Sequence, residues 1–318
     1  PPWEVLAARK NPDLVRGQLP AGALYLTLAV DVQGDGLYWE RGGWGQGKQS
    51  WLVEYGYLSG ETDVPGEGAW LKLDRIAEHG VSFQGIRLAD DLIAVDSGYN
   101  TEAVYAWVRS RANALAVKGE DGWAKAPIFR AVTPDLKVRG RNAGKYKKYG
   151  LKVWLIGTWG IKSTLMRLFA REQKQGEGGV PTGYCNFPRD TEDEYFKHLS
   201  NEVLKIENSD LATKRPWERE GPNLGLEGRA DNWALTHHAG LWGWGEADWE
   251  RRAADLTAML EDETPDMFDR STTAVMAPEP VAPDDMDDGE VEQAARVGAS
   301  RKADDGLDFF QDLVDAGH

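Results

Sequence analysis

The sequence predicts a mixed α/β fold, in which an antiparallel meander opens a sheet that helices then cover. Three β-rich segments follow one another with short turns between them: Leu24–Val32, Leu37–Gly42 and Gln49–Tyr57. Because short turns join antiparallel neighbours, these segments predict a three-stranded meander. Later strands alternate with amphipathic helices, an order typical of a mixed sheet flanked by helices.

Local patterns predict the other elements of this fold. Leu73, Ile76 and Ala77 have helical spacing and predict a helix over Trp70–His79. Short apolar runs bounded by turn residues predict strands, and apolar residues every three to four positions predict helices. The strands are expected at Leu92–Val95, Ala114–Lys118 and Leu151–Ile156, and the helices at Thr101–Arg111, Gly160–Gln173, Asp190–Leu199 and Asp231–Leu241.

Acidic residues are concentrated at the C-terminal end. The 318 residues include 52 acidic and 37 basic ones, a net charge of −15. Residues 246–318 hold 21 acidic and 6 basic residues, so the rest holds 31 of each and is neutral. The overall charge therefore does not exclude a nucleic-acid substrate. The single cysteine, Cys185, excludes an internal disulfide framework and a cysteine-built zinc site.

Composition divides the chain into three parts. Residues 1–20 are polar and proline-bounded and predict a linker, with one short helix around Trp3–Ala8. Residues 21–249 form one domain. Residues 250–318 predict an acidic, largely disordered tail, because Pro278–Glu292 is rich in proline and acids. A short C-terminal helix is the exception, with an apolar face suited to a partner's groove that comprises Leu307, Phe310, Leu313 and Val314.

Two aspartates are candidate metal ligands. Asp31 lies between Val30 and Val32 in an apolar strand, where a carboxylate is costly unless it is paired or binds a metal. Asp96 ends the strand Leu92–Val95. Carboxylates on neighbouring strands can clamp two divalent ions about 3.5–4 Å apart, as in phosphodiester-cleaving nucleases, and such oxygen ligands suit Mg²⁺ or Mn²⁺. The competing interpretation is that both are ordinary strand-end turn residues.

Asp231 is the third candidate acid. It stands at the start of the last predicted helix, where aspartate is also a favoured N-cap. The neighbouring His237 and His238 are not expected to bind metal. Two segments resemble phosphate-binding loops. Gly42–Lys48 lacks the hydroxyl residue that follows the lysine, and Gly157–Ser163 lacks the adjacent Gly-Lys pair, so an ATPase is not expected from this chain.

A basic loop is a candidate for contact with a polyanion. Cations contact phosphates and aromatic rings contact sugars or bases, and here Tyr146 and Tyr149 are interleaved with the cations. A solvated loop is the alternative. Its six basic residues are Lys137, Arg139, Arg141, Lys145, Lys147 and Lys148.

Several motifs in order carry a family resemblance. The run Leu26–Gln33 (LTLAVDVQ) and the motifs after it resemble the nuclease domain of lambda-like phage terminase large subunits, over roughly Leu24 to Leu241. The further motifs are Gly43-Trp44-Gly45, Ser50-Trp51, Ala94-Val95-Asp96-Ser97-Gly98, Val117-Lys118-Gly119, Ile156-Gly157-Thr158 with Lys162, and Asn186-Phe187-Pro188.

This resemblance implies an RNase H-like fold that cuts double-stranded, concatemeric viral DNA during genome packaging in the host cytoplasm, using two divalent metal ions. It makes Asp31 and Asp96 metal-binding catalytic carboxylates and Lys118 a candidate phosphate contact. It also implies an ATPase domain upstream of residue 1, a small terminase subunit as partner, and a C-terminal tail that engages the portal protein.

One motif departs from the family pattern. The family usually has Asn-x-x-Leu-Asp on the last helix, whereas Asn232-Trp233-Ala234-Leu235 is followed here by Thr236. Asp231 is the expected substitute. The alternative is a catalytically weakened RNase H-like module that binds DNA or the portal, which the missing acid favours. Another RNase H-like enzyme, such as a Holliday-junction resolvase, is disfavoured by the number of matching motifs.

Overall fold

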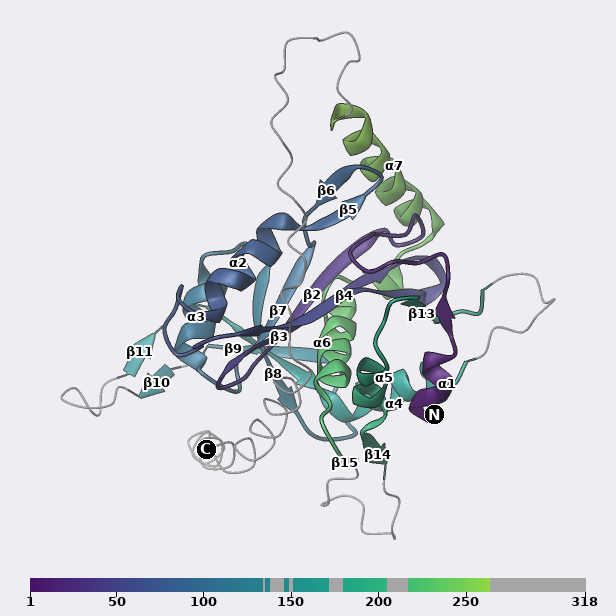
Figure 1. The fold of residues 1–318 in the computed structure, drawn as a ribbon. Coiled ribbons are helices and arrows are strands. Elements are labelled where there is room, and N and C mark those ends of the chain that lie inside the picture. Colours follow the sequence, from purple (N-terminus) through teal and green to yellow (C-terminus); the bar gives the residue numbers. More distant parts are fainter. Residues whose placement is uncertain (134, 138–145, 149–150, 172–179, 205–216, 264–318) are drawn as a thin grey trace.

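A nine-stranded sheet with helices on both faces forms the centre of the part described by the computed structural model, residues 1–133, 135–137, 146–148, 151–171, 180–204 and 217–263 (Figure 1). The predicted mixed α/β fold is confirmed. In spatial order the strands are β1 (Lys10–Asn11), β13 (Cys185–Pro188), β4 (Ser50–Ser59), β3 (Gly36–Trp44), β2 (Tyr25–Val32), β7 (Leu92–Asp96), β8 (Ala114–Glu120), β12 (Val153–Gly157) and β9 (Ile128–Val132).

The predicted meander forms the middle of this sheet. Strand β2 pairs antiparallel with β3, which pairs antiparallel with β4. On its other side β2 runs parallel to β7, and β7, β8 and β12 continue as parallel neighbours. A meander whose first strand is extended by parallel strands is the arrangement that the RNase H-like prediction requires. The carboxyl ends of β2, β7, β8 and β12 consequently lie along one edge of the sheet.

Helices cover both faces of the sheet. They are α1 (Trp3–Ala7), α2 (Ala69–His79), α3 (Thr101–Arg109), α4 (Thr158–Phe169), α5 (Asp193–Ser200), α6 (Leu224–His238) and α7 (Glu246–Glu263). Two short 3-10 turns, η1 (Gln46–Lys48) and η3 (Leu241–Gly243), and three hairpins complete the described elements: β5 (Val81–Phe83) with β6 (Ile86–Leu88), β10 (Asp135–Lys137) with β11 (Tyr146–Lys148), and β14 (Glu202–Leu204) with β15 (Trp217–Arg219). No helix in the described part is long and apolar enough to cross a bilayer.

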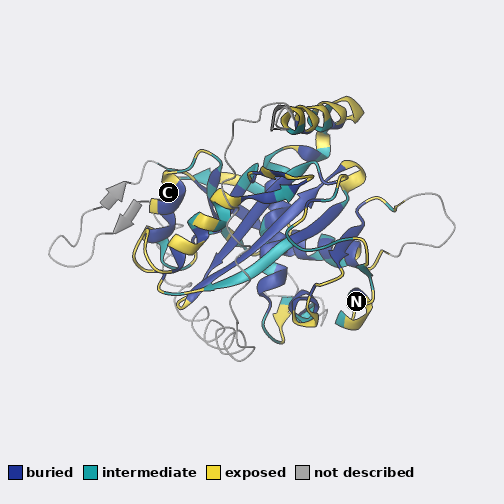
Figure 2. Cartoon of the chain, turned by 45° about the horizontal axis from the view of Figure 1, so that its top comes forward, coloured by how far each residue is buried: buried dark blue, intermediate teal, exposed yellow. Residues whose placement is uncertain are grey.

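The side chains of β2 alternate between two buried layers. Val30 and Val32 pack in a core with α2 and α3. The residues between them point to the opposite face, where α4, α5 and α6 pack over Ala94 and Val117 in the second core. We call this second side the α6 face. Figure 2 shows the strands as mostly buried. Asp31 is itself buried, and the alternation places it on the α6 face.

The first twenty residues pack on the domain. We expect a linker here, but Leu6 is fully buried in the core of the α6 face, and β1 pairs in parallel with β13 at the edge of the sheet. The predicted short helix is present as α1. Burial of one apolar residue in the core holds this segment on the domain although its composition is polar. Composition alone therefore predicted a linker where the structure shows packing.

The expected tail begins as a helix. Residues 250–263 are helical and not irregular as expected for the tail, because α7 extends to Glu263. Trp249 and Leu256 are buried, and Arg252 donates hydrogen bonds to the Leu24 carbonyl and to Asp91 at 2.8 and 2.6 Å. Apolar residues seven apart on a helix lie on the same side, a signal that acidic composition obscures. Residues 264–318 lie outside the described residues, and with them the expected C-terminal helix.

Candidate functional site

The geometry of β2 and β7 brings Asp31 and Asp96 together. The two strands pair in parallel with Val30 opposite Val95, and each aspartate is the next residue on its strand. Residues in register on parallel strands point to the same face, and neighbouring strands lie about 4.8 Å apart. The two carboxylates therefore lie side by side at the carboxyl edge of the sheet, on the α6 face, although 65 residues separate them in the chain.

The Asp31 side chain is almost completely buried, with 2% of its surface exposed. The Gln33 Nε2 amide donates a hydrogen bond to its Oδ2 at 2.7 Å, and Tyr38 stands opposite it on β3. Burial of a carboxylate is unfavourable unless donors or cations compensate it. The prediction of a buried acid inside an apolar strand is thus correct.

Asp96 is more accessible because it ends β7. The Gly98 N–H donates to its Oδ1 at 3.0 Å, and a Cβ atom at position 98 would lie 3.2 Å from Oδ2. Glycine therefore lets the turn fold back closely against the carboxylate. Ser97 is tied to β8, since its N–H and its hydroxyl both donate to the Val117 carbonyl, each at 2.8 Å. The turn predicted after β7 thus holds the Asp96 carboxylate in one orientation.

Asp231 lies within α6 rather than at its start. The helix begins at Leu224, so the N-cap interpretation of Asp231 is wrong. The helix packs over β2, β3 and β7 on the α6 face, and Asp231 is only partly buried. Among the described residues, no three His, Cys, Asp or Glu side chains form a group that could hold a metal ion. Asp231 is therefore on the same face as Asp31 and Asp96 without completing a three-ligand cluster with them.

Thr236, where the family pattern has an acid, is buried away from that edge. Its hydroxyl donates to the Trp233 carbonyl at 2.6 Å. One turn earlier, the Asn232 Nδ2 donates to the Glu40 carbonyl at 2.9 Å, and the Trp233 ring meets Trp44 further along β3, at 5.8 Å between centroids. Since α6 runs toward the Trp44 end of β3, position 236 lies further from Asp31 than position 231 does.

Lys118 approaches the same edge from β8. Burial lowers the pKa of Lys118 below its ordinary value, although the charges of Asp96 and Glu120 act to raise it. In register, Asp96 stands opposite Val117, the residue before Lys118, so the Lys118 side chain leaves β8 on the face opposite to that of Val117. The role of Lys118 as a phosphate contact stays a prediction.

A buried polar network beside Asp231 holds α6 on β3. The carboxylate of Glu40 forms an ion pair with Arg229 at 3.0 Å and accepts a hydrogen bond from the Tyr195 hydroxyl at 2.9 Å. Arg229 also donates to that hydroxyl at 3.0 Å. Glu40, Arg229 and Tyr195 are all at most 2% exposed. Burial raises the pKa of Glu40, while the Arg229 charge opposes that shift. We call these three residues the Glu40 network.

A second network ties α6 to α4. Lys162 donates to both carboxylate oxygens of Glu202 at 2.8 Å and to Glu227 at 2.9 Å, and Asn223 donates to both acids. Burial acts to lower the pKa of Lys162, but Glu227 and Glu202 outweigh it and raise the pKa. Neither network was predicted from the sequence. The available signals were Glu40 inside an apolar strand and Lys162 within a predicted helix.

Comparison with known proteins identifies the family. The family model for the terminase large subunit gpA, endonuclease domain, matches residues 1–249. The chain belongs to this family. The resemblance found in the sequence motifs is thereby confirmed, and a nuclease role in DNA packaging follows for this terminase nuclease domain. No curated protein and no solved structure matches the chain.

The basic segment of the terminase nuclease domain differs in part from the expected loop. Its described ends form a hairpin, in which β10 and β11 pair antiparallel with Lys137 opposite Tyr146 and Asp135 opposite Lys148. Lys147 also lies on β11. The other three cations, Arg139, Arg141 and Lys145, lie outside the described residues. The apolar face of Leu307, Phe310, Leu313 and Val314 also lies outside them.

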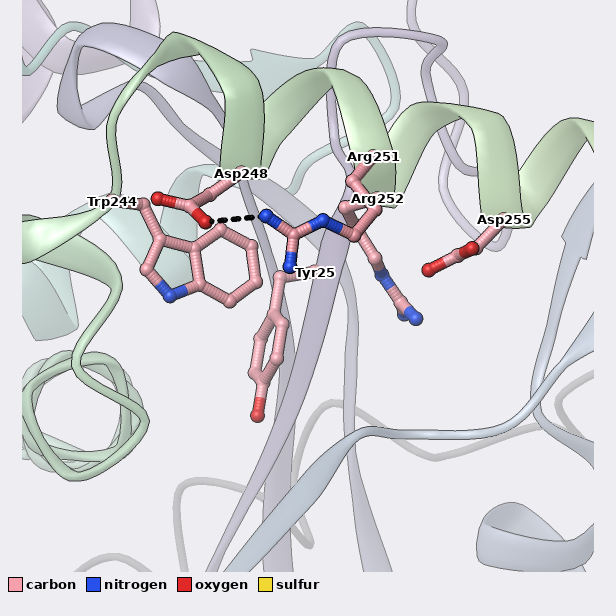
Figure 3. Close-up of a pocket in the computed structure, with 6 residues that line it drawn as sticks. All are labelled: Tyr25, Trp244, Asp248, Arg251, Arg252 and Asp255. Carbon is pink, nitrogen blue, oxygen red and sulfur yellow. Dashed lines mark hydrogen bonds and ion pairs between the residues drawn. The ribbon is translucent and has the colours of Figure 1, made fainter.

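A shallow pocket of about 330 Å³ lies where α7 crosses the first residue of β2 (Figure 3). Tyr25 and Trp244 line it with an edge-to-face contact at 6.0 Å, and Arg251 forms an ion pair with Asp248 at 3.0 Å. Tyr25 begins β2, whereas Asp31 is near its end. The pocket is thus at the opposite end of the strand from the two catalytic candidates of the terminase nuclease domain.

Proposed function

We propose that this chain is a metal-dependent endodeoxyribonuclease that cuts double-stranded concatemeric DNA during packaging in the host cytoplasm. One observation carries the proposal. Asp31 and Asp96 are adjacent on neighbouring parallel strands, in a chain that belongs to an endonuclease family. Asp31 and Asp96 are proposed to bind the metal ions, with Asp231 as the third carboxylate.

The donor set fits two divalent ions such as Mg²⁺ or Mn²⁺. Both aspartates offer hard carboxylate oxygens, and the burial of Asp31 within an apolar layer is favourable when a cation neutralises it. When bound, such ions activate a water for in-line attack and stabilise the leaving oxygen. The chain's own contribution is to orient the carboxylates through Gln33 and Gly98, and to steady a substrate phosphate with Lys118.

Plasmid digestion tests this function. Supercoiled plasmid is incubated with the protein in Mg²⁺, in Mn²⁺ and in EDTA, and nicked and linear products are separated on a gel. Cleavage with either metal and none with EDTA is the expected result. Cleavage that persists in EDTA, or an absence of cleavage with both metals, contradicts the proposal.

A catalytically weakened module that binds DNA or the portal is the second candidate. It is favoured by Thr236, which stands where the family pattern has an acid. The same digestion separates the two, because the weakened module binds DNA without cutting it under any of the three conditions. The binding is measured on the same plasmid by gel shift.

The basic segment is proposed to contact DNA phosphates. Replacing Lys137, Lys147 and Lys148 by alanine is expected to weaken DNA binding and to flatten its salt dependence, since each lost phosphate contact releases about one counterion fewer. The slope of log affinity against log salt is measured by fluorescence anisotropy. Three lost contacts make that negative slope shallower by about 2.7. An unchanged slope excludes these lysines from the interface.

The C-terminal tail is proposed to engage the portal protein through its apolar face. An upstream ATPase domain and a small terminase subunit are proposed as further partners. Deletion from Pro278 onward is expected to abolish portal binding in a pull-down and to leave plasmid cleavage unchanged. The competing role is autoinhibition, in which the acidic tail keeps the basic segment off DNA. Unchanged portal binding with tighter DNA binding after the deletion would favour autoinhibition.

A further inference from the structure

An exposed tryptophan stands beside the proposed cleavage edge. Trp123 lies in the loop 121–127 that follows β8, and 46% of its surface is exposed. Its ring packs edge to face on Trp159, with 5.6 Å between centroids and 66° between planes. Trp159 is buried in the first turn of α4. One part of the Trp123 ring is therefore held by the protein, and another part is presented to solvent.

The loop that carries Trp123 is tightly held. The Gly157 N–H donates to the carbonyls of Ala126 and Pro127 at 3.2 and 3.3 Å. A Cβ atom at position 157 would lie 2.5 Å from the Ala126 oxygen, so glycine permits this close contact. At the start of the loop, the Thr158 hydroxyl bonds to Asp121 at 3.1 Å. The ring is thus ordered before any ligand arrives, which reduces the entropic cost of binding.

The position of the loop places this ring near Asp96. Strands β7, β8 and β12 are consecutive parallel neighbours, and Trp123 follows the end of β8 and meets the helix that follows β12. In register, Asp96 stands opposite Val117, and Val117 stands opposite Trp154. Strands β8 and β12 each continue three residues beyond these positions before the loop and α4 begin, so the ring is displaced from Asp96 both across the sheet and along the strands.

One of the two acids beside Trp123 is paired with a cation. Of the two acids beside it, Glu120 forms an ion pair with Lys125 at 2.6 Å, and Asp121 is hydrogen-bonded by Thr158. Lys118 stands between the loop and Asp96 on β8. A rigid aromatic ring next to ammonium groups is a combination that binds nucleic-acid strands through sugar and base contacts.

We propose that Trp123 is a DNA-contacting residue, whose exposed ring packs on a sugar or base of the DNA bound at the Asp31 and Asp96 edge. This proposal rests on the proposed nuclease function. It assigns the apolar part of DNA binding to a residue on the structured edge of the sheet, separate from the phosphate contacts of the basic segment.

The salt dependence of binding tests this contact. Binding of the full chain to a labelled 30-base-pair duplex is measured in EDTA, where metal-dependent cleavage cannot proceed, at several salt concentrations. Trp123→Ala is expected to weaken binding about 5- to 100-fold without a change in the slope against log salt, because a stacking contact releases no counterions. Trp123→Tyr is expected to keep most of the affinity. Leu71→Ala, at an exposed apolar residue of α2, is the control and binds like the wild type.

If Trp123→Ala binds DNA with wild-type affinity, the proposal is overturned. It is also overturned if Trp123→Ala binds more weakly and Trp123→Tyr binds no better than Trp123→Ala. In both cases metal-dependent cleavage by the wild type leaves the nuclease function standing. Absence of DNA binding by the wild type in EDTA overturns the Trp123 proposal, whereas the plasmid digestion decides the nuclease function. Thermal unfolding of each variant confirms that the fold is intact.

Discussion

Replacing Asp31 or Asp96 by asparagine is expected to reduce metal-dependent plasmid cleavage by on the order of a thousand-fold. Asparagine keeps the shape of the side chain and removes the negative charge that binds the ion. Metal stabilisation of the transition state amounts to several kcal/mol, and each 1.36 kcal/mol corresponds to a tenfold change in rate. Initial rates are measured in Mn²⁺ over a range of metal concentrations.

Two comparisons make this result specific. Asp63→Asn changes an exposed carboxylate and should cleave at the wild-type rate. Asp231→Asn should also lose activity if α6 supplies the third carboxylate. Unchanged cleavage by Asp31→Asn or Asp96→Asn would show that the paired aspartates are not the catalytic residues. Thermal unfolding should show that both variants remain folded, because neither substitution changes side-chain volume appreciably.

Replacing Arg229 by methionine is expected to destabilise the fold by about 3–5 kcal/mol. The substitution leaves Glu40 buried without its cation, and breaking a buried ion pair at one partner costs that much in general. Glu40 and Arg229 are at most 1% exposed, so water cannot replace the lost partner. The free energy of unfolding is measured by urea denaturation.

The double variant Glu40→Gln with Arg229→Met separates loss of charge pairing from loss of packing. It should recover a large part of the stability, because no unpaired buried charge remains. The matched control is Arg251→Met, the same arginine-to-methionine change in an exposed ion pair. Arg251 pairs with Asp248, and its side chain is 70% exposed. An exposed pair contributes about 0–1 kcal/mol. Equal losses for Arg229→Met and Arg251→Met would contradict the assigned role of the Glu40 network.

Local sequence patterns predicted the elements that depend on neighbours in the chain. The β-rich segments and short turns of the meander were enough to predict β2, β3 and β4, because turn length and alternation are local properties. The same patterns identified Asp31 as an acid within an apolar strand and Asp96 as a strand-end residue. The start of α6 was missed by seven residues, since Gly225 and Gly228 weaken its helical pattern. Gly228 is favoured there by packing, as a Cβ atom would lie 3.1 Å from Tyr38.

Contacts between distant residues were decided only by the tertiary structure. The parallel pairing of β2 with β7 makes Asp31 and Asp96 neighbours, and no local pattern encodes which strands pair. Glu40 and Arg229 lie 189 positions apart and form an ion pair only because α6 packs on β3. Composition indicated an acidic tail after Trp249, yet burial of Leu256 continues the helix to Glu263. The sequence by itself determined which residue types can perform the chemistry, and long-range packing decided which of them meet, because burial depends on partners remote in the chain.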